Sequence, residues 1–130
     1  MRVVRIVVEH PRQTRRLDDY SASEWRAVIA GTLGGAIAEA QEAVFDLLAE
    51  GGGAILVSIP EVPRDAAARA AVAGLHGLVR SIAKEYGRKN IRCNMIVGPS
   101  FDIETMLADN PAITGELVAG SESVGAAGLD

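Results

Sequence analysis

The sequence contains few aromatic residues, one cysteine and no long uncharged apolar run. Phe, Trp and Tyr make up 4% of the 130 residues, which favours closely packed helices over an aromatic-lined groove. Because Cys93 is the only cysteine, no internal disulfide can form, and a reducing compartment fits. No uncharged run is long enough to span a bilayer, and two arginines interrupt the apolar run at residues 1–10, unlike a signal peptide. We expect a cytoplasmic protein that does not bind membranes.

The sequence also lacks the excess of positive charge that a nucleic-acid-binding surface needs. Its 13 Lys and Arg are outnumbered by 17 Asp and Glu, so the net charge is −4. No metal site is expected, because His76 has no partner at ligand spacing and Cys93 alternates inward on a predicted strand. The length predicts one domain, residues 1–120, followed by a small polar tail, residues 121–130.

Hydrophobic periodicity predicts four strands and two long helices. Apolar residues recur at helical spacing after Ser21, which forms a capping-box pattern with Glu24, and again after Asp65. The predicted strands are residues 2–9, 54–59, 91–97 and 114–120, and the predicted helices are residues 21–50 and 66–88. This alternation is typical of an α/β fold with a parallel sheet of three to four strands.

The handedness of parallel crossovers places both long helices on one face of the sheet. The next crossover, residues 100–111, is too short for a covering helix. The opposite face is therefore expected to be bare and mixed in polarity, because Arg5, Arg92 and Asn94 cannot all lie in a core. We expect solvent or another chain to cover it.

Four segments resemble the carboxyl-terminal half of the short-chain dehydrogenase/reductase family. They are "SASEWRAVIAGTLGG", "GGGAILVSIP", "GLVRSIAKEYGRKNIRCNMIVGPS" and "LADNPAITGELVAG". The third carries the family's Gly-Leu, Arg-Ser, Ala-x-Glu and Ile-Arg-x-Asn run. Together the segments cover most of the chain. The resemblance implies a partial Rossmann-like fold with two long helices on one face.

The residues that carry the family's chemistry are replaced. The family's Asn, Ser, Tyr and Lys positions align with Thr32, Pro60, Ala68 and Val72, with Ser58 two residues early. Ala and Val cannot replace a phenol and the ammonium that lowers its pKa. The Gly-rich dinucleotide turn is absent, because the glycines near position 31 lie inside a predicted helix, and the family's Pro-Gly is reversed at residues 98–99. We expect no cofactor and no hydride transfer by this chain alone.

Polar residues at predicted strand ends offer an enzymatic alternative. Glu9 and His10 follow the first strand, and Ser58 and Glu61 lie at the end of the second. A cofactor-free reaction could use them, or the chain could complete a shared site of an NAD(P)-dependent oxidoreductase. Without a nucleophile-elbow turn, ordinary loop polarity is the favoured interpretation.

The apolar helices favour a function based on association. The resemblance implies that these two helices pack against their counterparts in another subunit, and small residues on the second helix would let helix axes approach closely. We expect a homodimer, or a heteromer with an active reductase. The predicted interface residues are Val28, Leu33, Ile37, Val44, Ala70, Ala71, Gly74, Leu75, Gly77 and Leu78.

Overall fold

The computed structural model describes residues 2–12, 14–98 and 113–119. It is an α/β fold, as predicted, with a four-stranded parallel sheet in the order β1-β2-β3-β4. The strands are β1 (Val3–Val7), β2 (Gly53–Ile59), β3 (Ile91–Val97) and β4 (Leu117–Ala119). The predicted loop at residues 100–111 and the tail at residues 121–130 lie largely or wholly outside the described residues.

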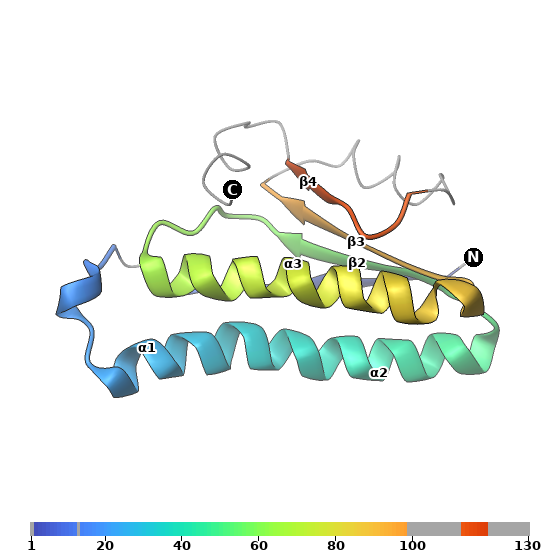
Figure 1. The fold of residues 1–130 in the computed structure, drawn as a ribbon, viewed down its shortest axis with the longest axis horizontal. Coiled ribbons are helices and arrows are strands. Elements are labelled where there is room, and N and C mark those ends of the chain that lie inside the picture. The colour runs from blue at the N-terminus through green and yellow to red at the C-terminus, as the bar shows by residue number, and fades with distance from the viewer. Residues whose placement is uncertain (1, 13, 99–112, 120–130) are drawn as a thin grey trace.

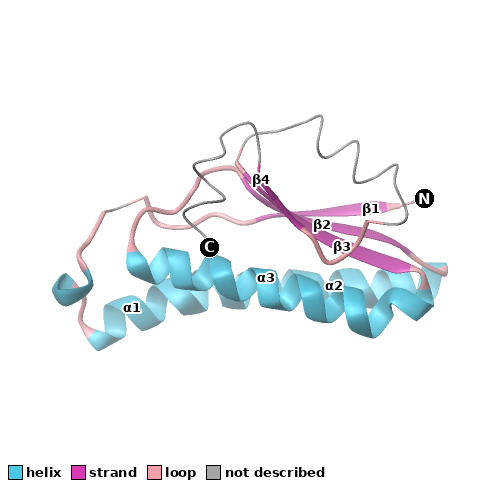
Figure 2. Ribbon diagram, turned by 45° about the horizontal axis from the view of Figure 1, so that its top comes forward, coloured by secondary structure: helices cyan, strands magenta, loops and turns pink. Residues whose placement is uncertain are grey.

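Both long helices lie on one face of the sheet, which confirms the prediction from crossover handedness (Figures 1 and 2). The first comprises α1 (Ala22–Ile29), a π turn η2 (Ala30–Gly34) and α2 (Gly35–Glu50). The second is α3 (Ala66–Tyr86). Short 3-10 turns precede α1 and follow α3, at η1 (Leu17–Asp19) and η3 (Gly87–Lys89). The predicted helix 21–50 is therefore correct in extent, but the π turn was not foreseen.

Side-chain caps fix the starts of both helices. The Ser21 hydroxyl accepts a hydrogen bond from the Glu24 amide, and the Glu24 carboxylate accepts one from the Ser21 amide, as the capping-box pattern predicts. At α3, Oδ1 of Asp65 accepts a 2.8 Å hydrogen bond from the Ala68 amide. At the start of each helix one backbone amide, that of Glu24 or of Ala68, is therefore satisfied by a hydroxyl or a carboxylate.

Glycine is required where α2 returns to the sheet. Gly53 has a φ of +151°, and a Cβ atom there would lie 2.6 Å from Leu47 Cδ2 and 2.7 Å from the carbonyl oxygen of Arg2. Such distances are shorter than van der Waals contact, so no other residue fits without movement. The fit lets β2 start directly beneath Leu47, which is fully buried.

The main core lies between the sheet and the helix layer. Alternate residues of the three longer strands pack there against α2 and α3, with Ile55, Val57 and Met95 almost fully buried. Val28 of α1 packs separately with Ala67 and Ala68 at the start of α3.

The expectation of a bare opposite face is wrong for β2 and β3. Leu56 and Ile96 are buried there and pack with Ile113 and Val118. The Asn94 amide nitrogen donates to the carbonyl oxygen of Ile113, and its side-chain oxygen accepts from the Glu116 amide, each at 3.0 Å. The remaining side chains of this face on β2 and β3 are also buried: Ala54, Ser58 and Arg92.

Of the three longer strands, β1 is the one whose side chains on this face are exposed. Val3 and Val7 are 43% and 50% exposed, and Arg5 is exposed between them. This face of the sheet is therefore covered by the chain itself at β2 and β3 and exposed at β1.

Candidate functional site

The positions that align with the family's catalytic residues form no proton-exchanging site. Ala68 and Val72 are fully buried inside α3, and Thr32 is buried in the π turn. Pro60 is exposed just after β2. Three of these four side chains have no group that can exchange a proton, so the geometry gives no substitute for the missing chemistry.

The strand-end residues Glu9, His10, Ser58 and Glu61 do not assemble into a relay. Nε2 of His10 lies 2.6 Å from the backbone carbonyl oxygen of Glu61, and Nδ1 lies 3.1 Å from that of Pro11. A carbonyl oxygen only accepts, so each of these contacts is a hydrogen bond only when that ring nitrogen carries hydrogen.

The other two candidates point elsewhere. The Glu61 carboxylate forms an exposed ion pair with Arg12, with an N–O distance of 3.1 Å. Ser58 is buried on the sheet face away from the helices, because it alternates with Val57 and Ile59 of the main core. Glu61 and Ser58 are therefore ordinary residues of a loop and of the sheet, and they do not face His10.

A polar cluster that the sequence reading missed lies between the starts of α1 and α3. The Tyr20 hydroxyl donates to Oδ2 of Asp65 at 2.5 Å, and Arg15 pairs with Glu24 while its guanidinium carbon lies 5.2 Å from the Tyr20 ring centroid. A hydrogen bond to Asp65, then desolvation, raises the pKa of Tyr20. Tyr20 thus donates to the residue that caps α3, so the cluster joins the segment before α1 to the start of α3.

The described residues do not fit a dinucleotide cofactor. Helix N-termini bind a pyrophosphate when their first amides are free and no negative charge opposes it. At α1 the Glu24 amide is capped by Ser21 beside the Glu24 carboxylate, which pairs with Arg15, and at α3 the Ala68 amide is capped by the carboxylate of Asp65. An incoming phosphate would meet like charge at both ends.

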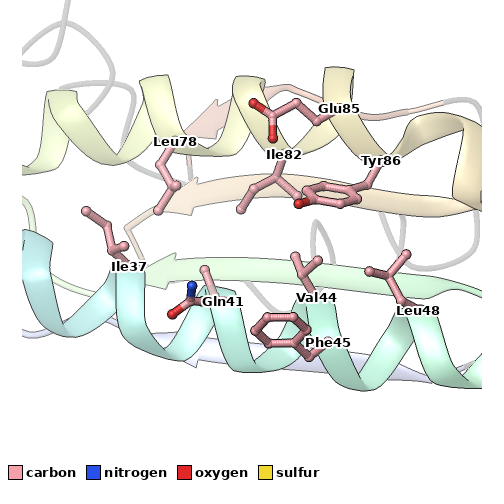
Figure 3. A pocket seen from close by; sticks show the side chains of 10 residues that line it. Ile37, Gln41, Val44, Phe45, Leu48, Leu78, Ile82, Glu85 and Tyr86 are labelled. Carbon is pink, nitrogen blue, oxygen red and sulfur yellow. The ribbon is translucent and has the colours of Figure 1, made fainter.

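The most prominent apolar feature is a groove between α2 and α3, which we name the α2–α3 groove (Figure 3). It has a volume of about 230 Å³. Its α2 side presents Phe45, 65% exposed, Ile37, 45% exposed, and Leu48, 39% exposed. The whole lining is Ile37, Ala40, Gln41, Val44, Phe45, Leu48, Leu78, Ile82, Glu85 and Tyr86.

The structure divides the predicted interface residues into three sets. Four are buried within the chain, although Val44 also lines the α2–α3 groove: Val28, Val44, Ala71 and Leu75. Leu33 and Gly74 face each other, since a Cβ on Gly74 would lie 3.2 Å from Leu33 Cδ2. Those that reach the surface are Ile37, Ala70, Gly77 and, half-buried, Leu78.

Phe45 and Leu48 were missing from that prediction. They continue a second stripe from Ile37 through Gln41, at spacings of four, four and three residues. The stripe could have been found by asking which apolar residues fall outside the core-facing row.

Two further searches cover the described residues only. None of them form a group of His, Cys, Asp and Glu that could hold a metal ion. No helix among them has the length and apolar character needed to cross a membrane.

Comparison with known proteins gives one family match. A family model described as enoyl-(acyl carrier protein) reductase matches residues 4–125. No curated protein matches the chain.

Solved structures with a similar fold belong to dehydrogenases and reductases. Acetoin dehydrogenase from Salmonella typhimurium has a TM-score of 0.78 at 21% identity, over 90% of this chain and 61% of its own. A 3-ketoacyl-ACP reductase from Sinorhizobium meliloti has 0.77 at 19%, over 90% and 66%. A 4-hydroxyisoleucine dehydrogenase solved with NADH and succinate has 0.73 at 21%, over 88% and 65%. The chain thus spans less than two thirds of their lengths.

Proposed function

The chain belongs to the short-chain dehydrogenase/reductase family, and we propose that it acts there as a non-catalytic subunit that associates with another chain. The partner is a second copy or an active reductase of the same family. This partner binds the chain on the surface formed by α1, α2 and α3. The exposed apolar α2–α3 groove carries this proposal.

The groove supports association because its apolar residues are contiguous. Single exposed apolar residues are ordinary on protein surfaces, but a connected row beside polar residues is typical of an interaction site. Ile37, Phe45 and Leu48 form that row, with Gln41 and Glu85 beside them. Burying the aromatic ring of Phe45 would supply the largest single apolar area.

Small residues on α3 support close approach of a partner helix. Ala70, Ala73 and Gly77 are exposed, and nothing lies within 4 Å of the place where a Cβ on Gly77 would stand. Interaxial distance between packed helices depends on the side chains at the contact, so this part of α3 accepts a close neighbour. In a homodimer a two-fold axis would bring the same surface from each copy together.

The absence of hydride transfer is supported by side-chain chemistry. The family resemblance assigns proton exchange to positions that hold Ala68 and Val72, and both are buried among apolar atoms. The carboxylates at the starts of α1 and α3 oppose a pyrophosphate. Calorimetric titration with NADH and NADPH should therefore show no binding, and micromolar affinity for either would contradict the non-catalytic role.

Association is tested by light scattering on wild type and three variants. Phe45→Glu places a charge in the groove, and Gly77→Trp adds a bulky side chain to α3 at a position where a Cβ would meet nothing within 4 Å. Leu17→Glu is the matched control, because Leu17 is 70% exposed on η1, away from the groove. We expect wild type and the control above the 13.6 kDa of one chain, and both test variants at that mass.

The same experiment identifies the partner. If the purified protein alone runs at 13.6 kDa, native mass spectrometry of the protein from its host should show it bound to a reductase, and Phe45→Glu should release it. Variants that keep the wild-type mass and partner would show that the groove is not the interface.

A further inference from the structure

We propose that a row of cations on the exposed side of α3 docks an acidic helix of the partner chain. The inference rests on the proposed association and names the chemistry that the partner must present. We name this surface the α3 basic row and define it by Arg69, Arg80, Lys84 and Arg88.

The cations of α3 share one side of the helix. Arg69, Arg80 and Lys84 are separated by eleven and four residues, which are close to three turns and one turn of an α-helix. Arg88 lies four residues further on, in η3. The Arg69 Nε donates to the carbonyl oxygen of Pro63 at 3.3 Å. All four cations are exposed, and none of them forms an ion pair with the described residues.

Two carboxylates flank the row without pairing with it. Glu85 lines the α2–α3 groove on one side. On the other side a Cβ on Gly115 would lie 3.5 Å from Ala83, and the exposed Glu116 follows that glycine. Neither carboxylate forms an ion pair with a described residue. The four cations outnumber these two carboxylates, so the row stays positively charged.

The helix dipole accounts for only part of the row. A cation in the last turn of a helix interacts favourably with the carbonyl groups there, and Lys84 lies in that turn. Arg80 precedes the last turn, and Arg69 lies in the first turn, where a cation is unfavourable. Charge complementarity with an anionic partner suits all of these positions.

Small residues beside the row favour a helix as the occupant. Ala73 and Gly77 are exposed between Arg69 and Lys84, so the backbone of a neighbouring helix can come close. Acidic residues at every fourth position of that helix would recur about every 6 Å, which is also the spacing of Arg80 and Lys84. Nucleic acid is disfavoured, because α3 exposes no aromatic side chain for base stacking and the chain carries a net charge of −4.

A second copy does not offer such an acidic helix. The acidic side chains of α2 lie beside cations of the same chain, since Asp46 and Glu50 pair with Arg2. Arg5 lines the same hollow as Glu42 and Asp46. The partner is therefore a chain of different sequence, whose helix carries carboxylates without cations beside them.

A fluorescent helical peptide with Glu at every fourth position of an alanine-rich sequence tests the row by anisotropy at low salt. We expect Arg80→Glu/Lys84→Glu to weaken binding at least about tenfold, because two attractions become repulsions. Arg12→Glu/Arg16→Glu makes the same change of net charge on exposed residues of the segment before α1 and should alter affinity by no more than about twofold. Equal loss in both variants, or no binding by wild type, would overturn the proposal.

Two competitors examine whether the row selects a helix with one acidic side. A peptide of the same composition, with its Glu residues spread around the helix, should bind more weakly than the first peptide. Equal affinity would reduce the effect to net charge and overturn the proposal. A single-stranded oligonucleotide that binds more tightly than the acidic peptide would also overturn it, in favour of nucleic acid.

Comparison with Phe45→Glu separates this inference from the proposed function. In native mass spectrometry of the protein from its host, Phe45→Glu and Arg80→Glu/Lys84→Glu should both release the partner. Release by Phe45→Glu alone would overturn the α3 basic row and leave the association in place. Release by the charge variant alone would support the row and contradict the role of the groove. If light scattering shows that the charge variant dissociates a homodimer, the occupant is a second copy and this inference is overturned.

Discussion

The Tyr20 hydroxyl donates a 2.5 Å hydrogen bond to the same carboxylate of Asp65 that caps α3. The two residues are 45 positions apart in the sequence. Asp65 is only 2% exposed, so its charge is held by these two donors rather than by bulk water. This contact joins the segment before α1 to the start of α3.

Removing the Tyr20 hydroxyl should destabilise the fold without changing its shape. Tyr20→Phe leaves one oxygen of a buried carboxylate without its donor, and we expect a loss of about 1–2 kcal/mol in the free energy of unfolding, measured with urea. Tyr86→Phe is the control, because the Tyr86 hydroxyl forms no hydrogen bond with the residues that the structure describes. Equal losses in the two variants would contradict the role assigned to the Tyr20–Asp65 contact.

The carboxyl of Glu24 should stay ionised in moderate acid. Its hydrogen bonds with Arg15, and then with Ser21, lower the pKa of Glu24 from 4.5 to about 2. A lowered pKa stabilises the folded state above pH 4.5, and this contribution is lost as pH falls towards 2. The carboxyl resonance in NMR should remain in its ionised position at pH 4.

Arg15→Ala provides the check on that cause. The variant removes the largest contribution to the shift, so the Glu24 carboxyl should titrate at higher pH than in wild type. An unchanged titration curve would assign the shift to the Ser21 cap alone.

The thiol of Cys93 should be inert in the folded protein. Burial raises the pKa of Cys93 from 9.0 to about 12, so the reactive thiolate is scarce at neutral pH. A disulfide reagent should label the thiol slowly in buffer and rapidly in urea. Rapid labelling of the folded chain would contradict the burial.

The same pKa shift predicts a pH dependence of stability. The thiol ionises near pH 9 in the unfolded chain but stays protonated in the folded one up to about pH 12. Its contribution to the free energy of unfolding is therefore fully present below pH 9. Between pH 9 and about pH 12 this contribution falls by about 1.4 kcal/mol per pH unit. The difference between wild type and Cys93→Ala isolates this contribution from other groups. A difference that stays constant from pH 8 to 11 would contradict it.

Periodicity predicted the fold well because it reports burial. Residues 54–59 read as a near-continuous apolar run, which predicts burial on two faces, and β2 is buried on both. The π turn escaped prediction because apolar spacing continues through Ala30–Gly34, and the two glycines there do not reveal an additional residue in one turn. The covering of β2 and β3 also escaped, since it depends on Asn94 bonding across 19 and 22 residues.

The candidate site was predicted less completely than the fold. Apolar spacing marks a helix face but does not say whether the sheet or a partner covers it, so Leu75 and Val44 were grouped with Ile37. Only the packing of α2 and α3 against the sheet shows which of these residues are buried and which are exposed. The Tyr20–Asp65 contact could not be predicted either, because the two residues are 45 positions apart and only the folded chain brings them together.

The π turn at Ala30–Gly34 absorbs one residue without changing the direction in which the flanking helices face. An α-helix advances about 100° per residue, and the wider π turn accommodates one additional residue within one turn, so α1 and α2 keep a common phase. Deleting a single residue there would restore a regular helix and leave Val28 against Ala67 and Ala68. If the additional residue were instead built into a regular helix, residues 22–29 would turn by about 100° around the axis and Val28 would lose that contact.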